Sequence, residues 1–352
     1  MTGQPGPAPA LTGLMGPRFD KPISLALQGG GAHGAFTWGV LDKLLEDSRL
    51  GIEAISGASA GSVNAVLLVS GWIAGGADEA RATLERFWRQ ISYDGDLSDA
   101  QRGIFDRLFT FWSPGGAASL WFEFLQQQVS PYQTNPLDIN PLRDLLARTV
   151  DFERLRASEV KLFISATSVR TGKIKIFETH ELMPEHVVAS ACLPTLFQAV
   201  EIDGEAYWDG GYSGNPALFP IFYAAHSDDV LLVQINPIER KEIPRDAQEI
   251  QNRLTEINFN AGLLRELRVI EFVTRLIDEG KLSRDQYKRV LMHRIGGDGA
   301  LERFAASSRL KAEWDFFLQL RDIGRAAAET WLTTHYDAVG RQGTLDLRAA
   351  YG

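Results

Sequence analysis

Three short stretches of the sequence carry residues that could do chemistry. The first is LALQGGGAHGAF at residues 25–36, where three consecutive glycines follow an apolar run. Such a loop brings backbone N–H groups close to a negative charge, either on a bound phosphate or on a reaction intermediate. The second, GASAGSVNA at residues 57–65, holds Ser59 in a G-x-S-x-G pattern. The third, WDGG at residues 208–211, contains an aspartate followed by two glycines.

Ser59 has the setting of a nucleophile, because its pattern lies between a predicted strand and a predicted helix. In a nucleophile elbow a sharp turn holds the serine in a strained conformation, and small neighbours prevent clashes. Ala58 and Ala60 are such neighbours. The helix N-terminus would also stabilise a serine alkoxide. The alternative is a plain strand-to-helix turn in which Ser59 only caps the helix.

The triglycine loop favours the catalytic alternative. Both turns close strands of one predicted parallel sheet, so both emerge at its carboxyl edge. There the N–H groups of Gly30 and Gly31 could form an oxyanion hole for a carbonyl attacked by Ser59. A phosphate cradle is the weaker alternative, because the Walker spacing is absent. Residues 29–34 do fit a dinucleotide pattern, but the acid expected about twenty residues later would be Glu53, near the start of its strand.

The base that activates the serine is predicted to be an aspartate. Five histidines follow the serine, and no predicted strand-end loop of catalytic character contains one: His180, His186, His226, His293 and His335. Asp209, in contrast, ends a predicted strand. Gly210 and Gly211 let the backbone turn so that its carboxylate points across the sheet edge. The alternative is a solvated aspartate in an ordinary Asp-Gly turn.

The elements around these residues predict an α/β fold. Residues 23–28 and 52–56 are apolar strands, each followed by an amphipathic or buried helix, which indicates a parallel sheet with helices on its faces. Residues 161–179 predict two strands joined by a tight turn. Residues 230–237 form the last predicted strand.

Long amphipathic helices are predicted from about residue 246 onward. In the first of them, apolar residues recur at helical steps: Ile250, Leu254, Ile257, Leu264 and Leu267. We expect this face to pack on the sheet domain, with contact to lipid or to a partner as the alternative.

Composition restricts the class of protein. The chain has 352 residues and a net charge of −9, which argues against broad binding to nucleic acid. Its single cysteine, Cys192, suits a reducing compartment. The first twenty residues lack the features of a signal peptide, and the apolar run at residues 63–74 is too short to span a bilayer. We therefore expect a cytoplasmic protein that could meet lipid peripherally at a membrane surface, with no transmembrane segment.

Residues 105–124 are unusually aromatic. Seven of these twenty residues are Phe or Trp, whereas the aromatic content of 10% predicts two. We interpret the stretch as a flap or wall of an acyl channel, with Phe111 and Trp112 binding substrate. The alternative is that these rings fill the core.

In this order, GGGAHGAF, GASAGSVNA and WDGG resemble the patatin-like phospholipases, a family of serine lipid acyl hydrolases. ASACLPTLF at residues 189–197 resembles a further block of that family, and the resemblance covers about residues 20–240. It implies that Ser59 is the nucleophile and Asp209 its only partner in a Ser-Asp dyad. It also implies that Gly29, Gly30 and Gly31 form the oxyanion loop. His33 stands where the family usually has Arg or Lys, which leaves the head-group preference open.

The sequence thus predicts a three-layer α/β/α patatin-like fold with a mostly parallel central sheet and a helical C-terminal layer. We expect a tail at residues 1–20, a catalytic domain at 21–240 and a helical region packed on it at 241–352. The predicted reaction is hydrolysis of a lipid ester through an acyl-enzyme on Ser59, with no metal or cofactor and no nucleic acid partner. An acyltransferase, a thioesterase or a non-catalytic lipid-binding protein are the alternatives.

An aspartate with an ordinary pKa near 3.9 is a poor base at neutral pH. The predicted mechanism therefore requires that burial in a dry site raise the pKa of Asp209.

Overall fold

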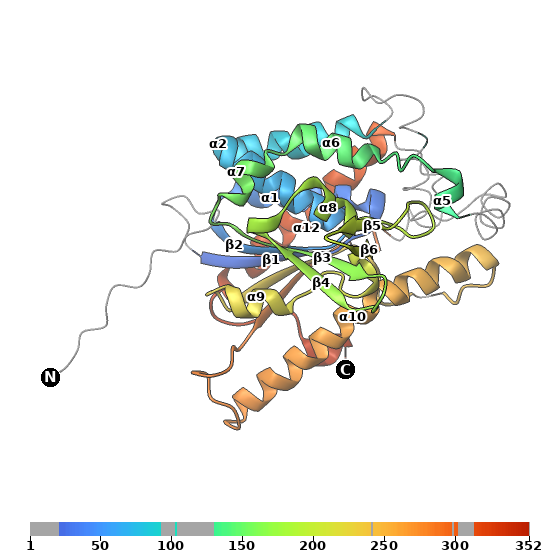
Figure 1. The fold of residues 1–352 in the computed structure, drawn as a ribbon. Helices are drawn as coiled ribbons and strands as arrows, with labels where there is room; N and C mark the ends of the chain where they lie inside the picture. The colour runs from blue at the N-terminus through green and yellow to red at the C-terminus, as the bar shows by residue number, and fades with distance from the viewer. Residues whose placement is uncertain are drawn as a thin grey trace.

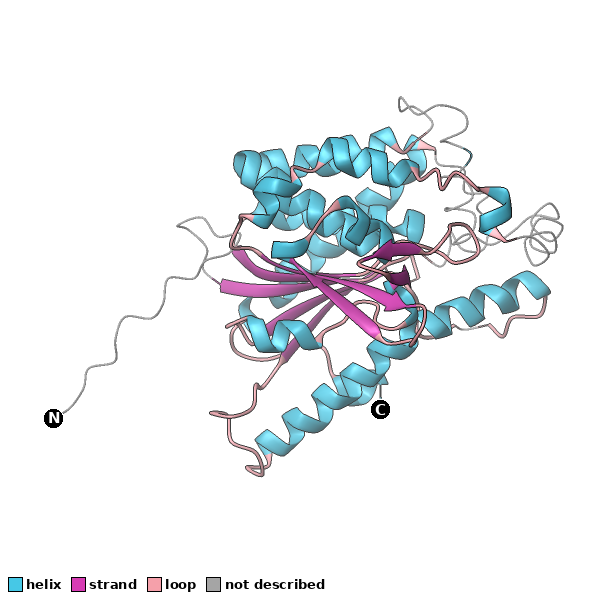
Figure 2. Ribbon diagram, viewed as in Figure 1, coloured by secondary structure: helices cyan, strands magenta, loops and turns pink. Residues whose placement is uncertain are grey.

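The computed structural model describes residues 21–92, 103, 130–240, 242–297, 299–301 and 313–351. A central sheet lies between two layers of helices (Figures 1 and 2). The strands are β1 (Lys21–Leu27), β2 (Leu50–Gly57), β3 (Lys161–Ser168), β4 (Ile174–Glu178), β5 (Val200–Ile202), β6 (Glu205–Asp209), β7 (Asp229–Gln234) and β8 (Leu291–Gly296).

The helices fall between these strands and after them. The α-helices are α1 (Gly34–Asp47), α2 (Ala60–Gln90), α5 (Pro131–Thr134), α6 (Pro141–Thr149), α7 (Phe152–Arg156), α8 (Pro184–Ser190), α9 (Phe219–Ala224), α10 (Ala247–Asp278), α12 (Trp314–His335) and α13 (Leu347–Tyr351). Short 3-10 turns are η1 (Gly31–His33), η2 (Thr179–Glu181), η3 (Gly210–Tyr212) and η4 (Tyr336–Ala338).

Among the described residues the sheet has eight strands, in the order β5-β6-β3-β2-β1-β7-β8, with β4 also paired to β3. The pairs along β3-β2-β1-β7-β8 are parallel, whereas β4, β5 and β6 pair antiparallel. The predicted α/β fold with a mostly parallel sheet and a helical C-terminal layer is confirmed. The strand predicted at residues 230–237 is present as β7, and β8, which the sequence patterns did not predict, extends the sheet beyond it.

Each face of the sheet has its own apolar core, because successive side chains of a strand point to opposite faces. In β1, Ile23, Leu25 and Leu27 join the larger core, which includes α1, α2 and α12. Ala26 joins a smaller core, which includes residues of α9 and α10. These two cores hold the carboxyl ends of β1 and β2 at fixed positions.

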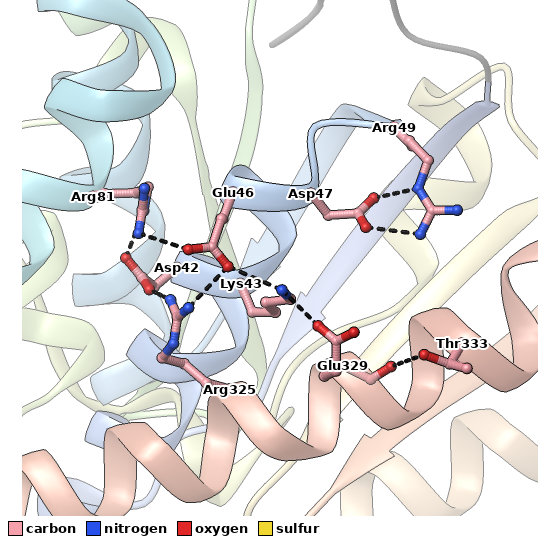
Figure 3. Close-up of polar contacts among 9 residues, drawn as sticks. All are labelled: Asp42, Lys43, Glu46, Asp47, Arg49, Arg81, Arg325, Glu329 and Thr333. Atoms are coloured by element: carbon pink, nitrogen blue, oxygen red, sulfur yellow. Dashed lines mark hydrogen bonds and ion pairs between the residues drawn. The ribbon is translucent and has the colours of Figure 1, made fainter.

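The C-terminal helix α12 packs directly on α1. A Cβ atom at Gly39 would lie 1.9 Å from the Arg321 carbonyl oxygen, and one at Gly324 would lie 2.1 Å from the Phe36 carbonyl oxygen. The two backbones can touch only because both residues are glycine. Ion pairs border this contact, with Arg325 between Asp42 and Glu46 (Figure 3).

Helix α2 is long and apolar enough to cross a membrane by length and composition. However, 56% of its most apolar window is buried within the protein. Its backbone also departs from helical geometry at Gly75 and Gly76. We conclude that α2 is a core helix, and its N-terminus directly follows Ser59.

Candidate active site

Ser59 lies in a strained turn between β2 and α2. Its φ and ψ are 51° and −124°, and a positive φ is a conformation that non-glycine residues rarely adopt. Its side chain makes no capping hydrogen bond to α2, which rules out the helix-cap alternative. Gly57 and Gly61 have no room for side chains, since a Cβ at Gly61 would lie 2.1 Å from the Leu27 carbonyl oxygen. This is the geometry of a nucleophile elbow.

Neighbouring serines hold this turn in place. The Ser59 N–H donates to Ser190 Oγ at 3.0 Å, and Ser62 Oγ donates to the Ser59 carbonyl at 2.6 Å. Ser190 is the last residue of α8 and belongs to the ASACLPTLF stretch at residues 189–197. That stretch therefore supports the elbow through a side chain 131 residues away along the chain.

Asp209 ends β6 and is fully buried. Its Oδ1 accepts a hydrogen bond from the Gly211 N–H at 2.7 Å. Its Oδ2 is also buried and has no hydrogen-bond partner within the described part of the chain. Burial raises the pKa of Asp209 from 3.8 to about 7, while the Gly211 N–H and the Ser59 hydroxyl lower it. The fold thus brings the Ser59 hydroxyl to a carboxylate that is basic enough to accept a proton near neutral pH.

The two glycines after Asp209 are required by lack of space. A Cβ at Gly210 would lie 2.1 Å from the Ser165 carbonyl oxygen, and one at Gly211 would lie 2.0 Å from the Phe259 ring. The turn therefore fits tightly between β3 and α10. In this turn the Gly211 N–H donates to Asp209 Oδ1, and this hydrogen bond helps to hold the carboxylate in place.

The triglycine loop lies against the elbow. A Cβ at Gly29 would be 2.6 Å from the Ser59 Cβ. The Gly29 N–H donates to Asn215 Oδ1 at 2.7 Å, so it is already engaged. Within the predicted oxyanion loop, the Gly29 peptide therefore anchors the loop, and the role of the loop in catalysis stays a prediction.

Gly30 and Gly31 remain available as donors. Their N–H groups have no acceptor in the ranges that the structure describes. Gly31 has a φ of 55°, in the left-handed region that favours glycine. Two free N–H groups on a loop that contacts the elbow are what an oxyanion hole requires.

Buried amide side chains that the sequence analysis did not identify hold this loop. Asn236 Nδ2 donates to the Gly29 carbonyl at 2.6 Å. Gln28 Oε1 accepts from the N–H groups of Ile235 and Asn236, and Gln28 Nε2 donates to Asn260 Oδ1 at 2.9 Å. No sequence signal marks Asn236 or Asn260, since their partners on the loop lie more than 200 residues away.

Histidines do not take part in these contacts. Burial lowers the pKa of His33 to about 4, so its ring is neutral at pH 7, and its buried Nε2 has no partner among the described residues. His293 Nε2 lies 2.8 Å from Asp229 Oδ1 at the amino end of β7, the edge of the sheet away from Ser59. Within the described ranges no histidine is hydrogen-bonded to Ser59 or Asp209.

Glu53 does not have the position that a dinucleotide-binding acid needs. Its carboxylate is buried within β2, where it accepts hydrogen bonds from the N–H groups of His226 and Ser227. It also pairs with Lys161. No group of three or more potential metal ligands is present within the described residues.

Phe111 and Trp112 lie outside the described residues. Their predicted role in an acyl channel therefore stays a prediction. The predicted tail at residues 1–20 also lies outside the described ranges.

Taken together, the fold and site define an α/β protein with a strained serine, a buried aspartate and free loop amides at one sheet edge. Residues 25–225 match the Patatin-like phospholipase family. This match covers more than half of the chain, and the protein belongs to the patatin-like phospholipase family. Membership of a family of phospholipases supports lipid hydrolase activity.

Three solved structures are similar to the chain at low sequence identity. VipD from Legionella pneumophila is 15% identical, with a TM-score of 0.44, and the match covers 91% of this chain and 68% of that one. The type III effector ExoU is 15% identical, with a TM-score of 0.36. That match covers 89% of this chain and 54% of the ExoU chain. The ExoU–SpcU complex of Pseudomonas aeruginosa is 17% identical, with a TM-score of 0.32. That match covers 93% of this chain and 66% of the other chain. No curated protein sequence matches the chain.

Proposed function

We propose that the protein is a lipid acyl hydrolase that uses Ser59 as nucleophile and Asp209 as its base. The observation that carries the proposal is the pairing of a strained serine with a fully buried carboxylate. One oxygen of that carboxylate has no partner within the described residues, and the Ser59 hydroxyl lowers its pKa. A carboxylate that lacks a hydrogen bond in a buried site is primed to accept a proton.

In the first step Ser59 Oγ attacks the carbonyl carbon of a lipid ester, and its proton moves to Asp209. The tetrahedral oxyanion then collapses, the ester C–O bond breaks, and the leaving alcohol takes the proton from Asp209. In the second step water attacks the acyl-enzyme and gives its proton to Asp209. Collapse of the second intermediate releases the fatty acid and returns the proton to Ser59.

The N–H groups of Gly30 and Gly31 would bind the oxyanion in both steps. The positive end of the α2 dipole adds to this stabilisation, because α2 begins immediately after Ser59. Donors placed in this way are typically worth about 2.7–4 kcal/mol of barrier each. The Asn215 and Asn236 side chains act by positioning, since they hold the Gly29 peptide that precedes both donors.

A fluorophosphonate probe tests the proposal. Intact protein is incubated with the probe, digested and analysed by mass spectrometry, and we expect one modified residue, Ser59. Ser59→Ala should abolish labelling and ester hydrolysis. Ser24→Ala is the matched control, because Ser24 is a buried serine on β1 whose hydroxyl has no hydrogen-bond partner among the described residues, so its loss should leave labelling intact.

The labelling result also separates the proposal from its alternatives. A non-catalytic lipid-binding protein would give no labelled serine. An acyltransferase would give labelled Ser59 but would transfer the acyl group to an added alcohol faster than to water. Labelling at another serine would refute the assignment of the nucleophile. The cytoplasmic location stays a prediction.

A further inference from the structure

Helix α10 packs one side against residues 209–219, the segment that begins with the candidate base. Phe259 contacts the first part of this segment, because a Cβ at Gly211 would lie 2.0 Å from its ring. About one turn further along the helix, a Cβ at Gly262 would lie 2.8 Å from a carbonyl oxygen of the segment. Glu266, another turn on, binds the last part of the segment. Residues at helical spacing on one side of α10 thus follow the segment from one end to the other.

This packed side includes only part of the apolar pattern of α10. Leu264 and Leu267 pack against the smaller core, as the sequence predicted. Ile250, Leu254 and Ile257 were also expected to pack on the sheet domain, but they are 43%, 46% and 48% exposed. For these three residues the prediction is wrong, because the N-terminal part of α10 extends beyond the sheet (Figure 1).

The Glu266 carboxyl group binds the N-terminus of α9. Its Oε2 accepts hydrogen bonds from the N–H groups of Leu218 and Phe219, both at 2.8 Å. Neither N–H group has another acceptor within the described ranges. Burial raises the pKa of Glu266 to about 7, whereas the two N–H groups lower it, so these hydrogen bonds favour the charged form. Hydrogen bonds to a charged acceptor are stronger than those between neutral groups, so Glu266 holds this end of the segment firmly.

The same segment holds the glycine loop through Asn215, three residues before Leu218. Asn215 Oδ1 accepts the Gly29 N–H at 2.7 Å, and Gly29 directly precedes the two candidate oxyanion donors. Between the two contacts, Ser56 Oγ donates to the Ala217 carbonyl at 2.5 Å. Ser56 therefore holds the carbonyl side of this short stretch, whereas Glu266 holds its N–H side. A shift of Leu218 would move Asn215 and, with it, the Gly29 peptide.

The other end of α9 is bound by lysines. Lys161 Nζ donates to the Ala224 carbonyl at 2.6 Å, and Lys288 Nζ donates to the Ala225 carbonyl at 2.7 Å. Negative charge at the N-terminus and positive charge at the C-terminus both suit the helix dipole. The C-terminal end of α9 leads to the start of β7, at the edge of the sheet away from Ser59. The two ends of α9 thus have similar charged contacts but differ in their distance from the candidate site.

We propose that Glu266 is a positioning residue for the oxyanion loop, because it holds the segment from which Asn215 anchors the Gly29 peptide. The inference rests on the proposed function, since it gives Glu266 a part in stabilising the oxyanion. Glu266 lies outside residues 25–225, the part of the chain that matches the family. The family-matched part alone would therefore lack one support of its oxyanion loop. The alternative is that Glu266 only stabilises α9.

Kinetics with p-nitrophenyl butyrate, a short ester, test Glu266→Ala. Rates are expressed per active site, counted by complete fluorophosphonate labelling of Ser59, so that unfolded protein does not lower kcat. A misplacement of about 1 Å can cost about a hundredfold in rate. Because Ser56 still holds the segment, we expect kcat to fall about tenfold, with KM within about twofold of the wild type. Glu266→Gln keeps an acceptor oxygen, so its kcat should be within about threefold of the wild type.

Lys288→Ala is the matched control, because it removes a charged side chain from the other end of α9. Its kcat should equal that of the wild type, whereas a role of Glu266 in stabilising α9 alone would make the two variants alike. Asn215→Ala should lower kcat at least as much as Glu266→Ala, and the double variant should lose no more than Asn215→Ala does.

Three kinetic results would overturn the proposal: unchanged kcat in Glu266→Ala, an equal loss in Lys288→Ala, or losses that multiply in the double variant. If Glu266→Ala does not fold, Glu266→Asp replaces it, because its side chain is shorter by one methylene. Its kcat should fall, and an unchanged kcat would again overturn the proposal.

Hydrogen exchange gives a readout that does not depend on catalysis. Asn215 protects the Gly29 N–H, so the peptide that contains Gly29 should take up deuterium faster in Glu266→Ala than in the wild type or in Lys288→Ala. Faster exchange in a protein that neither hydrolyses esters nor labels at Ser59 would support the role of Glu266 and refute the proposed function. Full esterase activity with unchanged exchange in Glu266→Ala would support the proposed function and overturn the role of Glu266.

Discussion

Asp209→Asn should make the protein more stable at alkaline pH while it abolishes ester hydrolysis. Burial raises the pKa of Asp209 from 3.8 to about 7, so the folded protein holds this proton more tightly than the unfolded chain does. The free energy of unfolding therefore falls as pH rises from about 4 to 7, and the loss remains above pH 7. An asparagine is never ionised and does not incur this cost.

The size of the effect follows from the shift. About three pKa units at 1.36 kcal/mol each correspond to about 4 kcal/mol. With an unfolding entropy near 2.1 cal/mol/K per residue, that is a gain of about 5 °C in melting temperature at pH 8.5. Near pH 4 the folded wild type carries a protonated Asp209, so there the variant and the wild type should have similar stability.

Denaturant unfolding and thermal melts across pH 4–9 measure this difference. Ser59→Ala is the control for lost activity, because it removes no titrating group. Asp278→Asn is the control for the sign, because Arg289 lowers the pKa of Asp278 and its loss should destabilise the protein at neutral pH. If Asp209→Asn raised the free energy of unfolding equally at pH 4 and pH 8.5, the argument that burial raises the pKa of Asp209 would be refuted.

Three further results are expected. The kcat/KM for a neutral ester should rise with pH through an apparent pKa of about 7, since Asp209 must be ionised to act as base, and a flat profile over pH 5–9 would contradict this. Gly31→Ala should lower kcat at least about a hundredfold, or about 2.7 kcal/mol, with little change in KM, because the methyl group crowds the oxyanion and the φ of 55° disfavours alanine. Unimpaired turnover in that variant would exclude the loop as an oxyanion hole. Substitution of each histidine in turn should leave the rate within about tenfold, whereas a histidine base would be worth about 10²–10⁴, so a thousandfold loss would disprove the Ser-Asp dyad.

The sequence was sufficient to predict the parts of the site that depend on short stretches of chain. The elbow around Ser59 requires small residues on either side, and the turn after Asp209 requires two glycines, so both leave a local pattern. The alternation of strands and helices likewise predicts the parallel part of the sheet. These features are visible because their physical cause lies within a few neighbouring residues.

The missed features depend on distant partners. Asn236 and Asn260 hold the glycine loop, yet nothing next to them in the sequence indicates a partner more than 200 residues away. Strand β8 follows a 32-residue helix and contains His293 and Arg294, so it lacks the apolar run that marked β7. For α10, the spacing of apolar residues predicted a helix with an apolar face. It could not show which of those residues pack on the sheet domain and which are exposed.

The contact between α1 and α12 has a consequence for how the protein is made. Helix α1 follows the glycine loop directly, but the helix that covers it is encoded almost 270 residues later. At a synthesis rate of about 5–20 residues per second, the face of α1 that α12 covers stays exposed until α12 has left the ribosome. We therefore expect a chain arrested near residue 240 to expose the apolar surface of α1 and to be bound by chaperones. The two glycines that allow this contact thereby tie maturation of the hydrolase to completion of its polypeptide.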